Sequence, residues 1–110
     1  MTVFKMIIDG KLPAKKVYED EIVLAIEDIR PVAPIHILII PKKEIIDLQS
    51  VEKEDLPVIG HMIEVAQKLA RDLKLENGYR LIANIGPDSG QEIAHLHFHL
   101  IAGKRLGRLG

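Results

Sequence analysis

The segment His95-Leu96-His97-Phe98-His99-Leu100-Ile101 places three histidines at alternate positions near the C-terminal end of the chain. Successive side chains of a β-strand point to opposite faces of the sheet, so this alternation puts the imidazoles on one face and apolar side chains on the other. The apolar face can pack in the core while the histidine face remains available for chemistry. We therefore expect a strand over residues 94–102 that bears the functional site.

Three interpretations of the histidine face remain open. It could be an ordinary polar strand face, although Thr, Lys or Glu would serve that purpose equally well. It could hold zinc, but a rise of about 3.3 Å per residue separates His95 and His99 by roughly 13 Å, so the metal would need two neighbouring histidines and a ligand from elsewhere. It could perform nucleophilic catalysis, in which a neutral imidazole attacks phosphorus and its neighbours donate protons or contact phosphate oxygens. His97, with a histidine on either side, is best placed for that attack.

Three further β-rich regions predict an antiparallel sheet of five strands in total. The first is a hairpin of Lys16–Glu19 and Ile22–Glu27 around the charged turn Asp20-Glu21. The second, Ile35–Ile40, is bounded by prolines on both sides. The third is Tyr79–Ala83, which precedes a glycine-rich loop.

Two helices complete the predicted domain. Apolar residues recur every three to four positions between Val58 and Leu73, as a long helix with one buried face requires. Asp55 is the predicted N-cap of this helix, Pro57 falls in its first turn, and Asn77-Gly78 supplies a left-handed stop. A short helix is expected over residues 3–9. Helices on an antiparallel sheet define an α+β architecture.

The composition describes one domain over residues 1–110. Hydrophobic residues make up 47% and charged residues 28%, which fits a globular domain and excludes a disordered chain. A net charge of −1 offers no surface for nucleic acid, and no apolar segment approaches the ~20 residues that span a membrane. The absence of cysteine and of a signal-peptide core favours a cytoplasmic location. Residues 104–110 form a basic tail that we expect to be solvated.

The histidine segment resembles the signature of the histidine triad (HIT) family, His-φ-His-φ-His-φ-φ, in which φ is hydrophobic. Upstream blocks follow the order found in the histidine triad nucleotide-binding (HINT-type) branch, and the resemblance covers nearly the whole chain. These blocks are Leu12-Pro13-Ala14-Lys15, residues 27–36, Ile40-Pro41-Lys42-Lys43, Tyr79-Arg80, Asn84-Ile85-Gly86 and Gly90-Gln91-Glu92. The resemblance implies a HIT-like fold in which one sheet runs across a homodimer.

The resemblance also implies a hydrolase that requires neither a metal nor another cofactor. Members of this branch bind purine nucleotides such as AMP and cleave the P–N bond of nucleoside 5′-phosphoramidates. By this comparison His97 is the nucleophile that becomes a nucleotidyl-histidine, His99 contacts the α-phosphate, and His95 orients the nucleophile. His36 matches a fourth histidine that belongs to the hydrogen-bond network of the active site.

The same comparison assigns the substrate-binding positions. Asp28, with Ile29 beside it, matches the acid that accepts hydrogen bonds from both ribose hydroxyls, a frequent use of carboxylates in nucleotide sites. Gly90 has no side chain, so a phosphate could approach the loop backbone there. The other residues of the phosphate-side loop are Asn84, Gln91 and Glu92, and the candidates for the pocket wall against the base are Phe4, Ile7, Leu12 and Leu38.

Two features depart from the better-studied relatives. Glu92 replaces the serine of the animal branch, and its carboxylate would repel a phosphate unless it faces the leaving amine or stays protonated. The basic tail replaces a longer C-terminal segment. Hydrolysis of dinucleoside polyphosphates and a non-catalytic nucleotide-binding or interaction module remain alternatives, the former favouring a wider and more basic cleft. His61 lies within the long helix, matches no catalytic position, and is expected to be a partly exposed structural residue.

Overall fold

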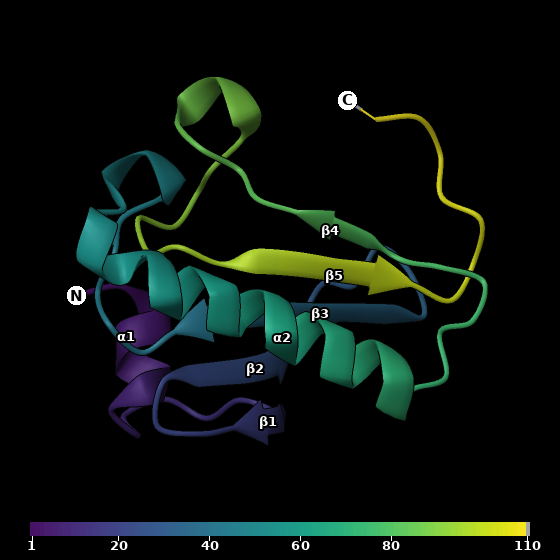
Figure 1. Ribbon diagram of the computed structural model, residues 1–110, viewed down its shortest axis with the longest axis horizontal. Coiled ribbons are helices and arrows are strands. Elements are labelled where there is room, and N and C mark those ends of the chain that lie inside the picture. The colour runs from purple at the N-terminus through teal and green to yellow at the C-terminus, as the bar shows by residue number, and fades with distance from the viewer. Residues whose placement is uncertain (110) are drawn as a thin grey trace.

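The computed structural model describes residues 1–109 and confirms the predicted α+β fold, with five antiparallel strands, one long helix and one short helix (Figure 1). The last residue of the basic tail, Gly110, lies outside the described residues. The elements are α1 (Val3–Ile8), β1 (Lys16–Glu19), β2 (Val23–Glu27), β3 (Ile35–Pro41), α2 (Leu56–Asp72), β4 (Arg80–Ile82) and β5 (Phe98–Ala102). Three short 3₁₀ turns, η1 (Leu48–Ser50), η2 (Lys53–Asp55) and η3 (Pro87–Ser89), lie in the connections.

The strands follow the order β1-β2-β3-β5-β4, and every neighbouring pair is antiparallel. The central strand β3 pairs with both β2 and β5, so segments far apart in the sequence become direct neighbours. In this register Leu38 lies opposite His99, and His36 lies opposite Ile101. The C-terminal histidine segment is thereby separated by only one strand, β3, from the acidic end of β2 and the loop that follows it.

The two faces of the sheet bury different side chains. On one face, Val23, Ala25, Ile37 and Ile39 pack with the apolar side of α2, which lies across the sheet in Figure 1. On the other face, Phe4 and Ile7 of α1 pack against β2 and β3 through Leu24, Ile26, Leu38 and Ile40. The predicted alternation of the histidine segment holds: Leu96, Phe98 and Leu100 join the α2 face, while His95 and His97 contact Phe4 on the α1 face.

The strand that bears the histidines is shorter than predicted. It begins at Phe98 rather than at residue 94, so His95 and His97 precede it. The pairing on both sides stops at this point: the last paired residues are Ile39 opposite Phe98 and Ile82 opposite His99, although β3 itself continues to Pro41. The chain before β5 is instead held by the Leu96 amide, which donates to the carbonyl of Ile45 at 2.6 Å.

Both predicted ends of α2 are correct in place but not in mechanism. Asp55 directly precedes the helix and Pro57 lies in its first turn, but the Asp55 carboxylate accepts from the Glu52 amide and pairs with Lys43 instead of capping α2. At the other end the left-handed residue is Lys74, with φ of 56°, rather than Gly78. The Leu75 amide donates to the Ala70 carbonyl at 2.9 Å, which completes a Schellman motif around Lys74. A residue with a Cβ therefore occupies a conformation that favours glycine.

Within residues 1–109 the structure contains no helix long and apolar enough to cross a membrane.

Candidate active site

A cavity of about 440 Å³ opens between α1, the end of β2 and the histidine segment. Its floor contains His97 and His99, and its rim contains the loop residues that precede them. The other lining residues are Val3, Phe4, Ile7, Ile26, Glu27, Asp28, Ile29, Arg30, Leu38, Asn84, Gly90, Gln91, Glu92 and Ile93. Every residue predicted to bind the ribose or the phosphate therefore lies on one cavity.

His97 is oriented by the backbone of its own segment. Its Nδ1–H donates to the carbonyl oxygen of His95 at 2.8 Å, because a carbonyl can only accept. The neutral ring therefore keeps the lone pair of Nε2 free. Burial lowers the pKa of His97 below its ordinary value, and Phe4 packs its ring edge against the imidazole with centroids 4.9 Å apart. The surroundings thus favour the neutral form, which is the nucleophilic one.

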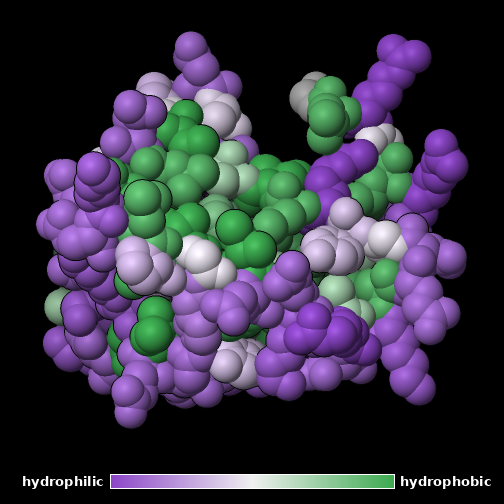
Figure 2. Space-filling view, viewed as in Figure 1, coloured by the Kyte–Doolittle hydropathy of each residue, from purple (hydrophilic) through white to green (hydrophobic). Residues whose placement is uncertain are grey.

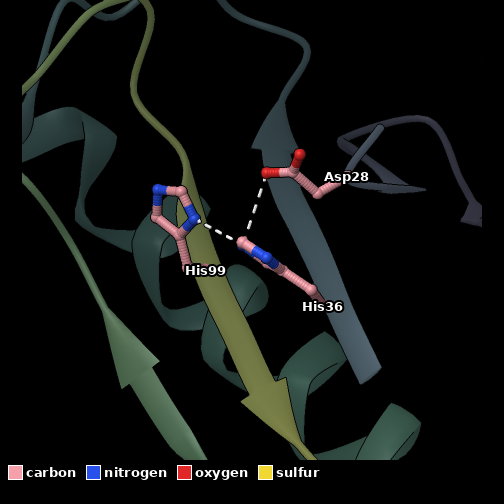
Figure 3. Close-up of side chains that lie close together, drawn as sticks. All are labelled: Asp28, His36 and His99. Carbon is pink, nitrogen blue, oxygen red and sulfur yellow. Dashed lines mark hydrogen bonds and ion pairs between the residues drawn. The ribbon is translucent and has the colours of Figure 1, made fainter. Parts of the chain in front are cut away.

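His99 is oriented by His36, which comes from the neighbouring strand β3 (Figure 3). The Val32 amide donates to His36 Nδ1 at 3.2 Å, so the proton of the neutral His36 ring resides on Nε2. Nε2–H then donates to His99 Nδ1 at 2.9 Å, and the His99 proton resides on the ring nitrogen away from His36. Burial, followed by the His97 and His36 rings, lowers the pKa of His99 to about 4. His99 is therefore a neutral hydrogen-bond donor.

Asp28 completes this network at the end of β2. Its Oδ2 lies 3.3 Å from His36 Nε2, and its Oδ1 accepts from the Arg30 amide at 2.8 Å. The side chain is 19% exposed and lines the cavity. His36 itself is buried and does not line this cavity. The sequence prediction that His36 belongs to a hydrogen-bond network is consistent with this arrangement.

His95 is buried and does not line the cavity. Its Nε2–H donates to the Pro41 carbonyl at 2.8 Å, which ties the histidine segment to the end of β3. The group that orients His97 is the backbone carbonyl of His95, not its imidazole. His95 thus influences the nucleophile by fixing the backbone.

The loop before the histidines turns at two glycines. Gly86 and Gly90 have φ of 76° and 87°, in the left-handed region where residues with a Cβ are strained. The Gln91 amide group braces this loop, because its Oε1 accepts from the Gly86 amide at 2.8 Å and its Nε2 donates to the carbonyls of Ile46 and Ile93. Glu92 is exposed at the cavity rim, and no ion pair to it occurs within residues 1–109.

The apolar wall differs from the prediction at one position. Phe4, Ile7 and Leu38 line the cavity as expected, whereas Leu12 does not. Gly10, with φ of 77°, turns the chain after α1 and directs Leu12 elsewhere. Five lining residues were not predicted as site residues: Val3, Ile26, Glu27, Arg30 and Ile93. Val3 directly precedes Phe4 on α1 and Arg30 lies in the 27–36 block, so part of the signal was present.

Asp28, His36 and His99 also form the one cluster within residues 1–109 that could hold a metal ion, with ligand atoms within 4.8 Å of one another. Only one member belongs to the triad, so this cluster differs from the pair of neighbouring triad histidines considered from the sequence. The Val32 amide opposes metal binding, because it requires a lone pair on His36 Nδ1 and so places a proton on Nε2, the atom that would face the ion.

His61 lies outside the cavity, as predicted, and is half-buried on α2. Its Nε2 lies 2.6 Å from Oδ2 of Asp20, which also accepts from the Tyr18 hydroxyl at 2.7 Å. The other Asp20 oxygen accepts from the amides of Ile22 and Val23. These contacts tie α2 to the turn between β1 and β2.

A half-buried, neutral histidine with a free nitrogen beside a second histidine donor defines a site suited to attack on a phosphoryl group. The sequence matches the HIT domain family over residues 9–106, so the chain belongs to the HIT, or histidine triad, family. A HIT-like protein of Chlamydia muridarum is 44% identical over 98% of this chain and 86% of its own length.

Solved structures give the same result. A HIT family hydrolase from Legionella pneumophila is 42% identical, with a TM-score of 0.95 over 97% of this chain and 96% of its own. A zinc-bound histidine triad family protein from Mycobacterium smegmatis is 34% identical, with a TM-score of 0.82 over 98% of this chain and 78% of its own.

Proposed function

We propose that this protein is a hydrolase of purine nucleoside 5′-phosphoramidates, of the kind found in the HINT-type branch, and that His97 is its nucleophile. The observation on which the proposal rests is the hydrogen bond from His97 Nδ1–H to the His95 carbonyl. This bond fixes the tautomer, leaves Nε2 as a lone-pair donor, and can stabilise the positive charge that the ring acquires when it bonds to phosphorus.

The reaction has two displacements. His97 Nε2 attacks phosphorus, the P–N bond of the substrate breaks, and the leaving nitrogen takes a proton from solvent water and departs as an amine. Water then attacks the nucleotidyl-histidine, the bond between phosphorus and His97 breaks, and a nucleoside monophosphate and the free imidazole result. His99 supplies a neutral N–H to a phosphate oxygen in both steps, since its lowered pKa keeps it unprotonated near neutrality.

The remaining cavity residues suit the nucleoside part of the substrate. Asp28 offers a carboxylate oxygen to the ribose hydroxyls, and Ile29, which is 92% exposed, can cover the base at the rim. Phe4, Ile7 and Leu38 give the base an apolar wall. Asn84, Gly90 and Gln91 form the phosphate side, with Gln91 acting through the loop that it braces.

The charge of the cavity favours this substrate over dinucleoside polyphosphates. Glu27, Asp28 and Glu92 line it, and Arg30 is its one arginine or lysine. The basic residues of the tail do not line it; Arg80 instead holds the tail by donating to the Gly107 carbonyl at 2.8 Å. Additional phosphates would meet net negative charge, whereas an amine leaving group would meet the Glu92 carboxylate.

A homodimer is part of the proposal. β4 is an edge strand whose backbone groups can pair with a second copy. Figure 2 shows hydrophobic side chains gathered over this face, and Ile63, Leu81 and Ile85 are exposed among α2, β4 and the loop that follows. Light scattering on the wild type and on Leu81→Lys tests it: a dimer that becomes a monomer supports this interface, and a monomeric wild type contradicts it.

The proposed activity is tested with adenosine 5′-phosphoramidate in the presence of EDTA, with AMP release as the readout. We expect the wild type to release AMP, His97→Ala to release none, and the matched control His61→Ala to release it at the wild-type rate. No release from the wild type in EDTA would contradict the proposal; recovery on adding Zn²⁺ would then favour a metal enzyme, and AMP binding without turnover would favour a binding module.

A further inference from the structure

Asp28 occupies a position from which it can act on the catalytic histidines as well as on a nucleoside. Its Oδ1 is engaged by the Arg30 amide at 2.8 Å, so the carboxylate is fixed in orientation. Its Oδ2 lies 3.3 Å from His36 Nε2, and the Asp28 side chain lines the cavity. The carboxylate therefore adjoins both a buried imidazole and the space that a substrate would fill.

His36 has a single proton for two acceptors. Because the Val32 amide occupies Nδ1, the only N–H of the neutral ring is at Nε2. That N–H has His99 Nδ1 at 2.9 Å and Asp28 Oδ2 at 3.3 Å (Figure 3). The His99 ring and the Asp28 carboxylate therefore compete for the same N–H. Because the carboxylate is charged, it competes strongly even though it is more distant.

We propose that Asp28 couples ribose binding to catalysis by releasing the His36 proton to His99. This inference rests on the proposed function, because it takes the ribose hydroxyls as donors to Asp28. Hydroxyl groups that donate to Oδ2 satisfy its charge and weaken its hold on His36 Nε2–H. The proton then bonds to His99 Nδ1 alone, which fixes the ring that contacts the phosphate. Asp28 is thus a positioning residue for His99.

The consequence separates this role from simple anchoring. A residue that only anchors the ribose contributes equally to the bound substrate and the transition state, so its loss raises KM and leaves kcat unchanged. A residue that sets the His99 hydrogen bond changes kcat. Binding of the ribose would then affect the reaction at phosphorus through Asp28, His36 and His99. The binding energy of a non-reacting part of the substrate would thus be used at the reacting centre.

The test compares adenosine 5′-phosphoramidate with its 2′,3′-dideoxy analogue on the wild type and on Asp28→Ser. Serine can still accept from the Arg30 amide in a local turn but is too short to reach His36. We expect the wild type to lose about tenfold in kcat on the dideoxy substrate, in addition to a higher KM, which corresponds to one hydrogen bond. We expect Asp28→Ser to turn over the dideoxy substrate with a higher kcat than the wild type does, because its His36 proton is always available to His99.

Two outcomes would overturn the inference: a wild type in which the dideoxy substrate changes only KM, or an Asp28→Ser variant whose kcat on that substrate is at or below that of the wild type. The control Glu27→Gln removes the adjacent carboxylate, and we expect it to keep the wild-type ratio of kcat values between the two substrates.

A spectroscopic readout makes the result independent of turnover and of whether Asp28→Ser folds. In ¹⁵N NMR spectra of the wild type, AMP should shift the His36 Nε2 resonance, and 2′,3′-dideoxy-AMP, which lacks the hydroxyl donors to Asp28, should not. Equal shifts with both nucleotides would contradict the coupling. Failure of the proposed function is distinguishable, because it would appear as no AMP release from the ribose-containing substrate.

Discussion

The molecule contains two aspartate–histidine pairs of similar chemistry in different surroundings. In the inner pair, Asp28 lies 3.3 Å from His36 beside the cavity, and in the outer pair Asp20, in the turn between β1 and β2, lies 2.6 Å from His61 of α2. The shorter pair is the one without a catalytic partner. Its third member is the Tyr18 hydroxyl, whereas the third member of the inner pair is His99.

The comparison shows that distance and charge do not identify a functional pair. Both oxygens of the outer carboxylate accept hydrogen bonds within the protein. Burial alone would raise the pKa of Asp20, but the hydrogen bonds from Tyr18, His61 and two backbone amides hold this pKa well below its ordinary value. The inner carboxylate, that of Asp28, lines the cavity. Its partner His36 donates a hydrogen bond to His99, whose ring also lines the cavity. The pair available for function is therefore the one that lies beside a cavity and can still accept a hydrogen bond from a ligand.

Substituting His36 and His61 in turn should give the largest difference between the inner pair and the outer pair. His36→Ala leaves His99 Nδ1 without its donor, and we expect kcat on adenosine 5′-phosphoramidate to fall about a hundredfold, in the range of a lost general acid–base contribution. His61→Ala should keep the wild-type kcat and unfold at lower urea concentration. Activity and unfolding curves of both variants check this. Equal kcat values for the two variants would remove the distinction between the pairs.

The pH profile should report the inner histidines and not the outer one. Since burial lowers the pKa of both His97 and His99, the latter to about 4, protonation inactivates the enzyme only at acidic pH. We expect the acidic limb of kcat/KM to lie between pH 6.5 and 4, with the same position in His61→Ala. A limb at or above pH 6.5 would show that the histidines are not desolvated in solution.

The free energy of unfolding should also depend on pH, first through the inner histidines and at lower pH through Asp20. His97 and His99 bind protons less readily when folded than when unfolded, so they destabilise the fold as the pH falls below 6.5. Asp20 stabilises the fold above its ordinary pKa of 3.8 and loses this contribution as the pH falls below that value. Asp20→Asn should therefore cost about 1 kcal/mol at pH 7, discounted for its partial exposure, and less at pH 3. Urea unfolding at the two pH values measures the difference, and an unchanged cost would assign it to packing.

Much of the fold was predictable from hydrophobic periodicity. The errors lie where contacts with residues remote in sequence determine the structure. Alternation located the sheet faces, and the 3.6-residue repeat located α2. The start of β5 depended on where its pairing with β3 and β4 stops, which a local pattern does not contain. The Asp55 carboxylate turned to Lys43, twelve residues away in sequence, although its local position is typical of a cap.

The candidate site was predictable in its residues more than in its connections. The triad and the Asp28 and His36 positions came from the resemblance, and all except His36 and His95 line the cavity. The tautomers were not predictable, because they depend on the Val32 amide reaching His36 when the loop folds back. Likewise, the role of Gln91 as a brace depends on the Ile46 carbonyl, which is remote in sequence.

The smallest expected effect sharpens the comparison by changing stability without touching either pair. Lys74 ends α2 in the left-handed region, where a Cβ costs roughly 1 kcal/mol, so Lys74→Gly should raise the free energy of unfolding by up to that amount. The gain is partly offset because glycine has more freedom in the unfolded chain. Urea unfolding measures the gain, and kcat should stay at the wild-type value. If kcat rose together with stability, the activity of this enzyme would be limited by its folded fraction, and the His61→Ala variant could no longer be interpreted as a purely structural control.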